Sequence, residues 1–294
     1  MHTATYYIDL LLSGITVGSL YALIAIGYTM VYGILRLINF AHGDIFMMSG
    51  FFMIYVSATL PMAVSIPVVL LMTVLLGVLI ERAAYKPLRS APRMSVMISA
   101  IGVSYLLQNL ATYITGGLAR PYPEIPFLKG TFMLGALKIK IITVVTPLLT
   151  ILLVIALVIF INHTKTGMAM RAVSRDFDTA RLMGIKVNNI ISVTFIIGSF
   201  LAGVGSILYF SNYGQVSPTI GAMPGLKAFV AAVFGGIGSI PGAFLGGLLL
   251  GIIESLAKAY ISTQLANSIV FAVLIVTLLV RPAGLLGKYV PEKV

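Results

Sequence analysis

Long apolar runs separated by short polar connectors make up most of the sequence. A helix needs about 20 mostly apolar residues to cross a bilayer, and runs of this length recur along the chain. The pattern predicts an all-α polytopic membrane protein with about eight membrane segments, in a single transmembrane domain over residues 1–294. The predicted segments lie at roughly 8–35, 45–60, 61–80, 95–115, 141–161, 188–210, 225–256 and 265–280.

Two interruptions in this pattern predict broken or re-entrant helices. The polar segment Asn39–Asp44 separates the first two runs, and glycines and a proline at 235–242 interrupt the seventh. The seventh run is therefore either two half-length helices or a re-entrant hairpin. Non-helical backbone at membrane depth persists only where protein or water satisfies its polar groups, so both interruptions need a reason.

Composition narrows the class of protein. Apolar residues make up 59% of the chain and charged residues 9%, whereas a soluble domain carries about 25% charged residues. An ordinary soluble enzyme and a disordered chain are both excluded. Because the chain has no cysteine, disulfides, thiolate metal sites and cysteine nucleophiles are excluded as well.

The net charge of +11 is concentrated in the connectors. Twelve of the 19 Lys and Arg residues lie in 81–94, in 162–187 or after residue 280, which is the positive-inside pattern of membrane proteins. We therefore expect these connectors and the C-terminus in the cytoplasm, with the N-terminus and 116–140 outside. The positive charge reports this topology and predicts no nucleic-acid partner.

Glycines indicate how the helices pack. The first and sixth runs share an echo, Gly18-Ser19-Leu20 and Gly198-Ser199-Phe200, and they run in opposite directions in the expected topology. One interpretation is an inverted repeat, the usual architecture of transporters, and the other is chance similarity. Glycines four apart, such as Gly14 and Gly18, predict close helix packing, with a narrow pathway lined by glycine backbone as the alternative.

Signatures of enzymes and metal sites are missing. The chain has no GxxxxGK[ST] loop for ATP and no HExxH motif, and its three histidines are far apart. Gly236-Ile-Gly238 lacks the third glycine of a dinucleotide site. We therefore expect no enzymatic activity, no metal and no bound cofactor.

Few acidic residues reach the apolar runs. Asp9, Asp44 and Glu254 lie at the edges of runs, and the other five acids lie in connectors or tails. A carrier driven by protons or sodium ions needs carboxylates at membrane depth, so this distribution counts against such a carrier.

The polar segment Asn39–Asp44 has two interpretations. In the first, Asp44 caps the following helix while Asn39 and His42 satisfy loop carbonyls. In the second, these side chains lie on a translocation path or its gate, together with glycines of the second interruption. The candidate path or gate residues are Asn39, His42, Asp44, Gly235, Gly236 and Gly238.

The connector 163–187 is longer than a turn requires. It predicts an amphipathic helix over 171–184, with charged residues largely away from an apolar stripe and Gly184 as the stop signal. Such a helix either lies on the inner leaflet, where its arginines meet anionic lipid, or inserts into a groove of a partner protein. The stripe consists of Met168, Met170, Ala172, Val173, Phe177, Ala180 and Met183.

This connector resembles the coupling loop of ABC importer permeases. Ala180 and Gly184 match the Ala-x-x-x-Gly of that loop, although Arg171-Ala172-Val173 stands where the family has Glu-Ala-Ala. Further stretches are similar to the permeases of branched-chain amino acid ABC importers, and the length suits the shorter of the two permease types. These stretches, which extend over nearly the whole chain, are Tyr32–Asp44, Glu81–Arg89, Arg171–Gly184, Gly235–Gly242 and Arg281–Gly287.

The resemblance implies a permease subunit that moves leucine, isoleucine or valine across a bacterial inner membrane by alternating access. It implies a homologous second permease, two cytoplasmic ATPases that bind the ATP and Mg²⁺, a periplasmic substrate-binding protein and membrane lipid as partners. The residues that it assigns to ATPase coupling are Arg171, Ala172, Arg175, Asp176, Ala180, Met183 and Gly184.

Two alternatives stay open: the permease of a urea or short-amide ABC importer, and a stand-alone secondary carrier or channel. An intramembrane hydrolase is not supported, because no Ser–His or paired-Asp arrangement falls within the predicted helices. The residues alone do not identify the substrate.

Overall fold

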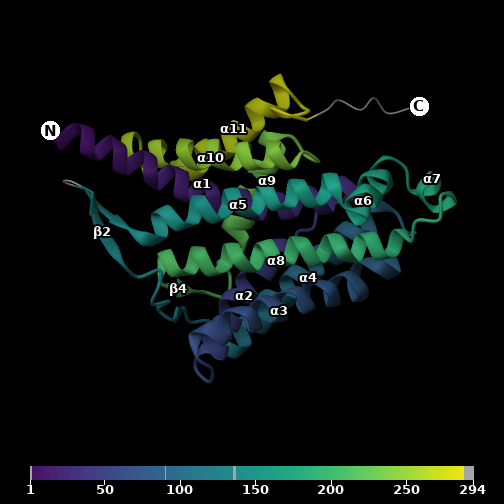
Figure 1. Cartoon of the computed structure of the whole chain (residues 1–294), viewed down its shortest axis with the longest axis horizontal. Helices are drawn as coiled ribbons and strands as arrows, with labels where there is room; N and C mark the ends of the chain where they lie inside the picture. The colour runs from purple at the N-terminus through teal and green to yellow at the C-terminus, as the bar shows by residue number, and fades with distance from the viewer. Residues whose placement is uncertain (1, 90, 135–136, 288–294) are drawn as a thin grey trace.

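The computed structural model describes residues 2–89, 91–134 and 137–287. In this part of the chain, six helices are long and apolar enough to cross a membrane. The helices run side by side along the long axis of the molecule (Figure 1). The prediction of an all-α polytopic membrane protein is confirmed. The helices are α1 His2–Leu35, α2 His42–Ser57, α3 Met62–Ile80 with the short turns η1 Glu81–Tyr85 and η2 Lys86–Leu88 after it, α4 Arg93–Thr115, α5 Ile141–His163, α6 Lys165–Arg175, α7 Phe177–Leu182, α8 Val187–Tyr213, α9 Ala222–Gly235, α10 Ile240–Tyr260 and α11 Ala266–Val280.

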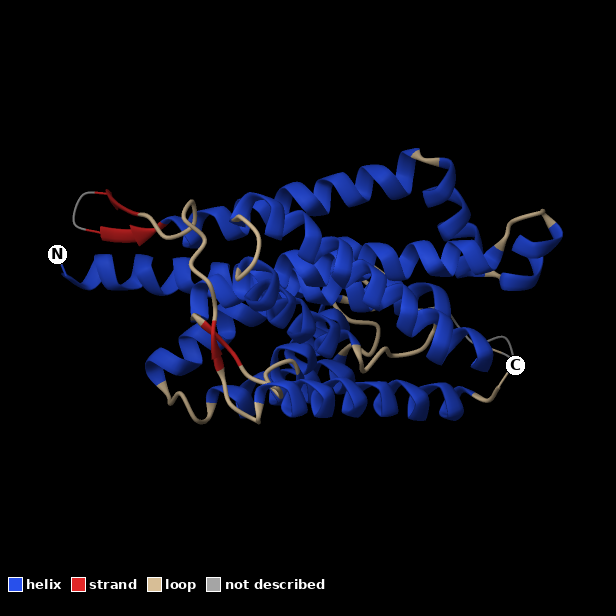
Figure 2. Ribbon diagram, turned by 90° about the horizontal axis from the view of Figure 1, so that it is seen from below, coloured by secondary structure: helices blue, strands red, loops and turns tan. Residues whose placement is uncertain are grey.

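Short strands lie beyond one end of the helices. β1 (Arg120–Pro121) pairs antiparallel with β4 (Gln215–Val216), and β2 (Thr131–Leu134) forms a hairpin with β3 (Leu137–Lys140). Both pairs lie at the end of the molecule where the chain begins, and α6 and α7 lie at the opposite end (Figures 1 and 2). The connectors 116–140 and 163–187 are therefore at opposite ends of the bundle, as the expected topology requires.

Helices α1–α3 and helices α8–α10 form two sets with matching contacts: α1 of the first set packs on α10, and α8 of the second set packs on α3. α1 runs antiparallel to α10, with Gly18 against Leu248, and α8 runs antiparallel to α3, with Ser199 against Gly77. The short helix α2 packs against α3 and α8, and its counterpart α9 packs against α10 and α1. The two sets of helices therefore share one packing arrangement, which supports the inverted-repeat interpretation.

Small residues bring α1 and α10 into backbone contact. A Cβ atom at Gly18 would lie 2.8 Å from the Cα and carbonyl oxygen of Leu248, and one at Gly251 would overlap the backbone of Gly18. Small residues let membrane helices approach closely and gain dispersion energy, where no hydrophobic effect drives the helices together. The paired glycines are packing residues, as their spacing predicts.

The predicted segment 225–256 is two helices, α9 and α10, joined by a short turn. α9 has 14 residues, whereas α10 has 21 and is long enough to cross the membrane, so the stretch is not two half-length helices. The two helices pack antiparallel against each other, with Gly235 against Gly242. The chain turns between them because Gly236 and Gly238 adopt φ values of +112° and +90°, which are costly for residues with a Cβ. Ser239 then caps α10 by accepting the Gly242 N–H at 3.1 Å. Besides the six long helices, the described residues include the shorter apolar helices α2, α9 and α11.

Candidate functional site

Two helix ends meet inside the bundle, at the first predicted interruption. α2 begins at His42, whose ring lies beside Gly27 of α1 and Gly198 of α8. Gly27 is eight residues, or about 12 Å, short of the end of α1, so α2 begins within the bundle. The N-terminus of α9 meets it there, because a Cβ at Gly43 would lie 2.5 Å from the carbonyl oxygen of Gly221. The positive ends of two helix dipoles therefore meet in the interior.

The polar residues of the first interruption are buried at this junction. Asn39 is 1% exposed, and His42 and Asp44 are each 2% exposed. The Tyr85 hydroxyl donates to Asn39 Oδ1 at 2.7 Å, and Gln108 Nε2 donates to Asp44 Oδ1 at 3.0 Å. The structure thus brings the three predicted side chains together around the start of α2 and ties them to η1 and α4.

The capping interpretation of Asp44 is wrong. The N-cap of α2 is Ala41, no side chain caps the helix, and Asp44 accepts a hydrogen bond from α4 instead. Asn39 Nδ2 and His42 Nε2 are buried without a hydrogen-bond partner among the described residues. Buried polar atoms are nearly always paired, so local helix capping does not explain why these two atoms are buried without a partner.

A cavity of about 290 Å³ lies beside the two helix ends. Gly43, Asp44, Gly221 and Gly225 form its buried part. Exposed residues of α4 and α9, among them Tyr105, form its mouth. Ligand sites in proteins begin at about 300 Å³ and combine apolar walls with a few polar groups, so this cavity suits a small amphipathic molecule.

The glycines of the second interruption lie elsewhere. Gly238 lies beside Gly33 near the end of α1, and a Cβ at Gly236 would overlap the backbone of Gly287. The backbone N–H of Leu286 donates to the carbonyl of Gly235 at 2.9 Å, which ties this turn to the chain after α11. The structure therefore separates Gly235, Gly236 and Gly238 from the cavity, and their role on a path stays a prediction.

The predicted helix over 171–184 is two helices, and this corrects the sequence analysis. α6 ends at Arg175, and α7 begins after Asp176, whose Oδ1 accepts the N–H groups of Asp178 and Thr179 at 2.9 and 3.0 Å. These hydrogen bonds, above all those from Thr179, hold the pKa of Asp176 below its usual value. Asp176 is a helix N-cap, which starts a second helix where the apolar periodicity suggested one continuous helix.

Much of the apolar stripe in this loop packs against the chain itself. Met170, Val173 and Ala180 are buried, whereas Leu182 and Met183 are 88% and 78% exposed. The surface left for a partner is therefore the tip of α7 and the exposed charged residues of the loop. Of the predicted coupling residues, Arg171, Arg175, Asp176, Met183 and Gly184 are exposed, Ala172 is half-buried and Ala180 is buried.

Gly184 has a different role from the expected tight packing. A Cβ there would meet no atom of the described chain within 4 Å, but its φ is +82°. The glycine is required by the left-handed backbone that ends α7. Any close contact at Gly184 would have to come from a partner.

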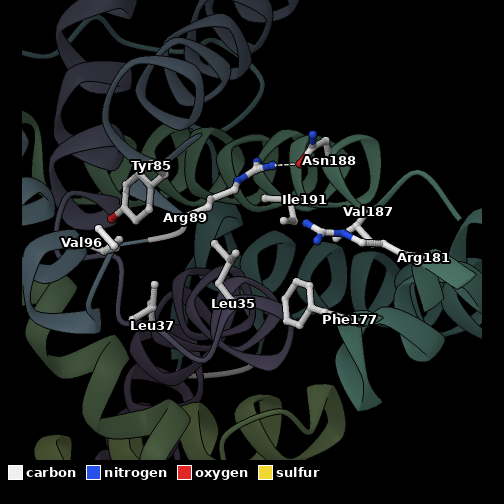
Figure 3. Close-up of a pocket in the computed structure, with 11 residues that line it drawn as sticks. Leu35, Leu37, Tyr85, Arg89, Val96, Phe177, Arg181, Val187, Asn188 and Ile191 are labelled. Carbon is white, nitrogen blue, oxygen red and sulfur yellow. Dashed lines mark hydrogen bonds between the residues drawn. The ribbon is translucent and has the colours of Figure 1, made fainter. Parts of the chain in front are cut away.

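A second pocket, of about 300 Å³, lies under α7 (Figure 3). Phe177 and Arg181 of α7 line it from one side and Tyr85 and Arg89 from the other. Arg89 donates to Asn188 at the start of α8 and pairs with Glu81. Burial lowers the pKa of Arg89, and Glu81 opposes that shift. Because Tyr85 also binds Asn39, the wall of this pocket that faces α7 is connected to the start of α2.

Sequence reasoning missed two buried carboxylates. Glu81, assigned to a connector, is fully buried, and Ser192 Oγ donates to its Oε2 at 2.9 Å. Glu254, assigned to the edge of a run, lies inside α10 with Lys227 and Lys258 at 2.8 and 2.6 Å. A lysine within an apolar run, at Lys227, was the signal that could have predicted the second cluster. No cluster in the described residues gathers three side chains able to hold a metal ion.

Comparison with known proteins gives one consistent family. The family described as "Branched-chain amino acid transport system / permease component" matches residues 10–279. The high-affinity branched-chain amino acid transport system permease proteins LivH of Salmonella typhimurium and BraD of Pseudomonas aeruginosa are each 42% identical to this chain, over 98% of both chains. A probable LivH of Methanocaldococcus jannaschii is 29% identical over 92% of this chain and 89% of its own. No solved structure matches. The chain therefore belongs to the family of branched-chain amino acid transport system permease components.

Proposed function

We propose that this chain is the transmembrane permease subunit of an ATP-driven importer that carries branched-chain amino acids across a bacterial inner membrane. The observation that carries the proposal is the 42% identity over 98% of both chains to permeases named for that transport. The subunit performs no covalent chemistry and binds no cofactor. ATP and Mg²⁺ belong to two ATPase partners, and a second permease and a periplasmic binding protein complete the importer.

The proposed mechanism is alternating access driven through the α6–α7 loop. Movement of an ATPase would act on the exposed tip of α7, at Leu182 and Met183, and on the arginines around it. Tyr85 lies under that loop and binds Asn39, so its displacement would reach the start of α2. The buried junction of α2 and α9 would then open to one side of the membrane at a time.

The proposed orientation places the α6–α7 end in the cytoplasm and the N-terminus outside, following the positive-inside rule. The C-terminus would also be cytoplasmic, although residues 288–294, with Lys288 and Lys293, lie outside the described residues. Because the chain has no cysteine, a Leu182→Cys variant tests this directly. Labelling of intact cells by an impermeant maleimide should fail, and efficient labelling would overturn the orientation.

Reconstitution of the whole importer in liposomes tests the function. Leucine, isoleucine or valine should enter only when the binding protein, both permeases, the ATPases and ATP are all present. Uptake by this chain without ATPases would identify a stand-alone carrier or channel. Uptake of urea or a short amide in place of these amino acids would identify the neighbouring class of importer.

A further inference from the structure

The junction cavity has the chemistry of an amino-acid site. We propose that it binds the substrate's head group during translocation, with Asp44 holding the ammonium group and the N-terminus of α9 facing the carboxylate. This inference rests on the proposed function and adds to it a site, an orientation for the substrate and a role for each wall.

Asp44 is a carboxylate without a resident cation. It is 2% exposed, it lines the cavity, and no basic side chain of the described residues pairs with it. The side chains that hydrogen-bond to it, Gln108 and Ser104, are both neutral, and a carboxylate can accept about four hydrogen bonds. A buried charge in a membrane protein is expensive unless it is paired, and such a residue usually marks a substrate or ion path. An ammonium group is the partner that this carboxylate lacks.

The other buried carboxylates show the difference. Glu254 has two lysines and the Tyr21 hydroxyl within 2.8 Å, and Glu81 has Arg89. Both carry their cation within the chain and are therefore structural. Among these three buried acids of the described residues, Asp44 is the one that lines the cavity.

The opposite wall suits a carboxylate. The first turn of α9 has no acidic residue, so the positive end of this helix dipole is not compensated by its own side chains. Gly221 and Gly225 are among the lining residues and pack against the backbone of Gly43, and the Tyr28 hydroxyl lies 3.3 Å from where a Cβ of Gly225 would stand. α2 differs, because Asp44 itself sits in its first turn and offsets its dipole. A substrate carboxylate is therefore better stabilised at α9 than at α2.

Apolar side chains line another part of the cavity. Ile101, Leu226 and Phe229 line it beside the two polar walls, at the side that leads to the mouth between α4 and α9. A branched aliphatic side chain would lie against them while the head group occupies the buried part. Polar groups at one end and apolar side chains at the other match the two ends of leucine.

Cysteine protection tests the site in the assembled importer without its binding protein. Leu226→Cys places the single thiol of the chain at the cavity mouth, and Tyr113→Cys, 88% exposed and not among the cavity residues, is the control position. Leucine should slow maleimide labelling at 226 but not at 113. At equal concentration, 4-methylpentanoate lacks the ammonium group and 3-methylbutylamine lacks the carboxylate, so each should protect about 10- to 150-fold less well, the range expected for one charged hydrogen bond.

Asp44→Asn should then abolish the preference for leucine over 4-methylpentanoate, while the exposed control Asp9→Asn should keep it. Absence of leucine protection in the wild-type background, or equal protection by the three ligands, would overturn the site even if Asp44→Asn failed to assemble. An intact preference in Asp44→Asn would overturn the role of Asp44. ATP-dependent leucine uptake is measured on the same preparations after the binding protein has been added. If uptake persists, only this inference fails, whereas loss of uptake in the wild type removes the proposed function itself.

Discussion

The short helices α2 and α9 occupy corresponding places in the two inverted halves, but their first turns carry different chemistry. The start of α2 and the residues just before it contain three buried polar residues, Asn39, His42 and Asp44, whereas the start of α9 is the apolar stretch 221–224. The repeat accounts for why both helices begin inside the bundle. It does not account for the polarity, which only the first copy has. The cavity therefore has a carboxylate, Asp44, on the side of α2 and glycine backbone on the side of α9. These two different walls suit a substrate with two chemically different ends.

The largest expected effect comes from separating the two helix ends. Gly43→Val would place a branched side chain against the backbone of Gly221, where even a Cβ is too close. Overpacking in protein interiors typically costs about 1–3 kcal/mol, and a backbone neighbour has little freedom to relax, so we expect the upper end of that range or more. Size-exclusion profiles of the fluorescently tagged subunit should show loss of the assembled permease pair. Gly102→Ala is the control, because a Cβ there meets nothing within 4 Å, and a loss of assembly equal to that of Gly43→Val would contradict the close contact.

Glu254 has lysine partners and Asp44 has no basic partner among the described residues, so we expect their substitution to affect stability and transport differently. Glu254→Gln leaves Lys227 buried without its counter-charge, and breaking a buried ion pair costs about 3–5 kcal/mol. Its melting temperature should fall strongly. Asp44→Asn keeps an acceptor for Gln108 and should melt near the wild-type temperature while transport is lost. A large drop in melting temperature for Asp44→Asn, with little for Glu254→Gln, would reverse the roles we assign.

A smaller effect is expected from the hydrogen bond between Tyr85, which lines the pocket under α7, and Asn39, which precedes α2. Tyr85→Phe removes the donor to Asn39 and leaves a buried acceptor unpaired. A typical net hydrogen bond contributes about 1 kcal/mol, so leucine uptake per ATP hydrolysed should fall roughly fivefold while ATPase binding persists. Tyr55→Phe, on an exposed face of α2, is the matched control. If both variants transport equally, the coupling does not pass through Tyr85.

The smallest effect concerns the break between α6 and α7. Asp176→Ala should increase hydrogen exchange over 177–182, and Asp176→Asn should not, because Asn caps as well as Asp. The pKa of Asp176 is lowered in the folded chain, so the cap contributes stability above its usual pKa of about 4 and loses it as the pH falls through the lowered value. Exchange over 177–182 should therefore be constant from pH 8 to 5 after correction for intrinsic rates. A rise within that window would show that Asp176 does not hold α7.

Hydropathy was sufficient to predict the class and the main helices, because a bilayer imposes a length of about 20 apolar residues on each span. It failed where local chemistry overrides periodicity. Asp176 starts a new helix within an apolar stripe. At Gly236 and Gly238 hydropathy alone shows one run, and the glycines were the signal that predicted the break.

The candidate site was predicted only in part. The polar residues Asn39, His42 and Asp44 stood out because they interrupt apolar runs. Their partners did not, because Tyr85 and Gln108 are far away in sequence and meet them only through the packing of η1 and α4. Glu81 and Glu254 were misplaced for the same reason, since burial at the end of a run depends on the neighbouring helices. Gly221 and Gly225 carry no side chain that could mark a site in the sequence, and their place at the cavity follows only from the packing of the two helix ends.

The central claim is that the junction of α2 and α9 is where an ATP-driven importer holds its substrate. The most direct measurement is ATP-dependent leucine uptake by liposomes that contain the complete importer with Asp44→Asn, beside the same importer with Asp9→Asn. The account predicts that Asp44→Asn lowers uptake by at least about tenfold, the effect of one lost charged hydrogen bond, with assembly and ATP hydrolysis retained. Equal uptake by the two variants would contradict it.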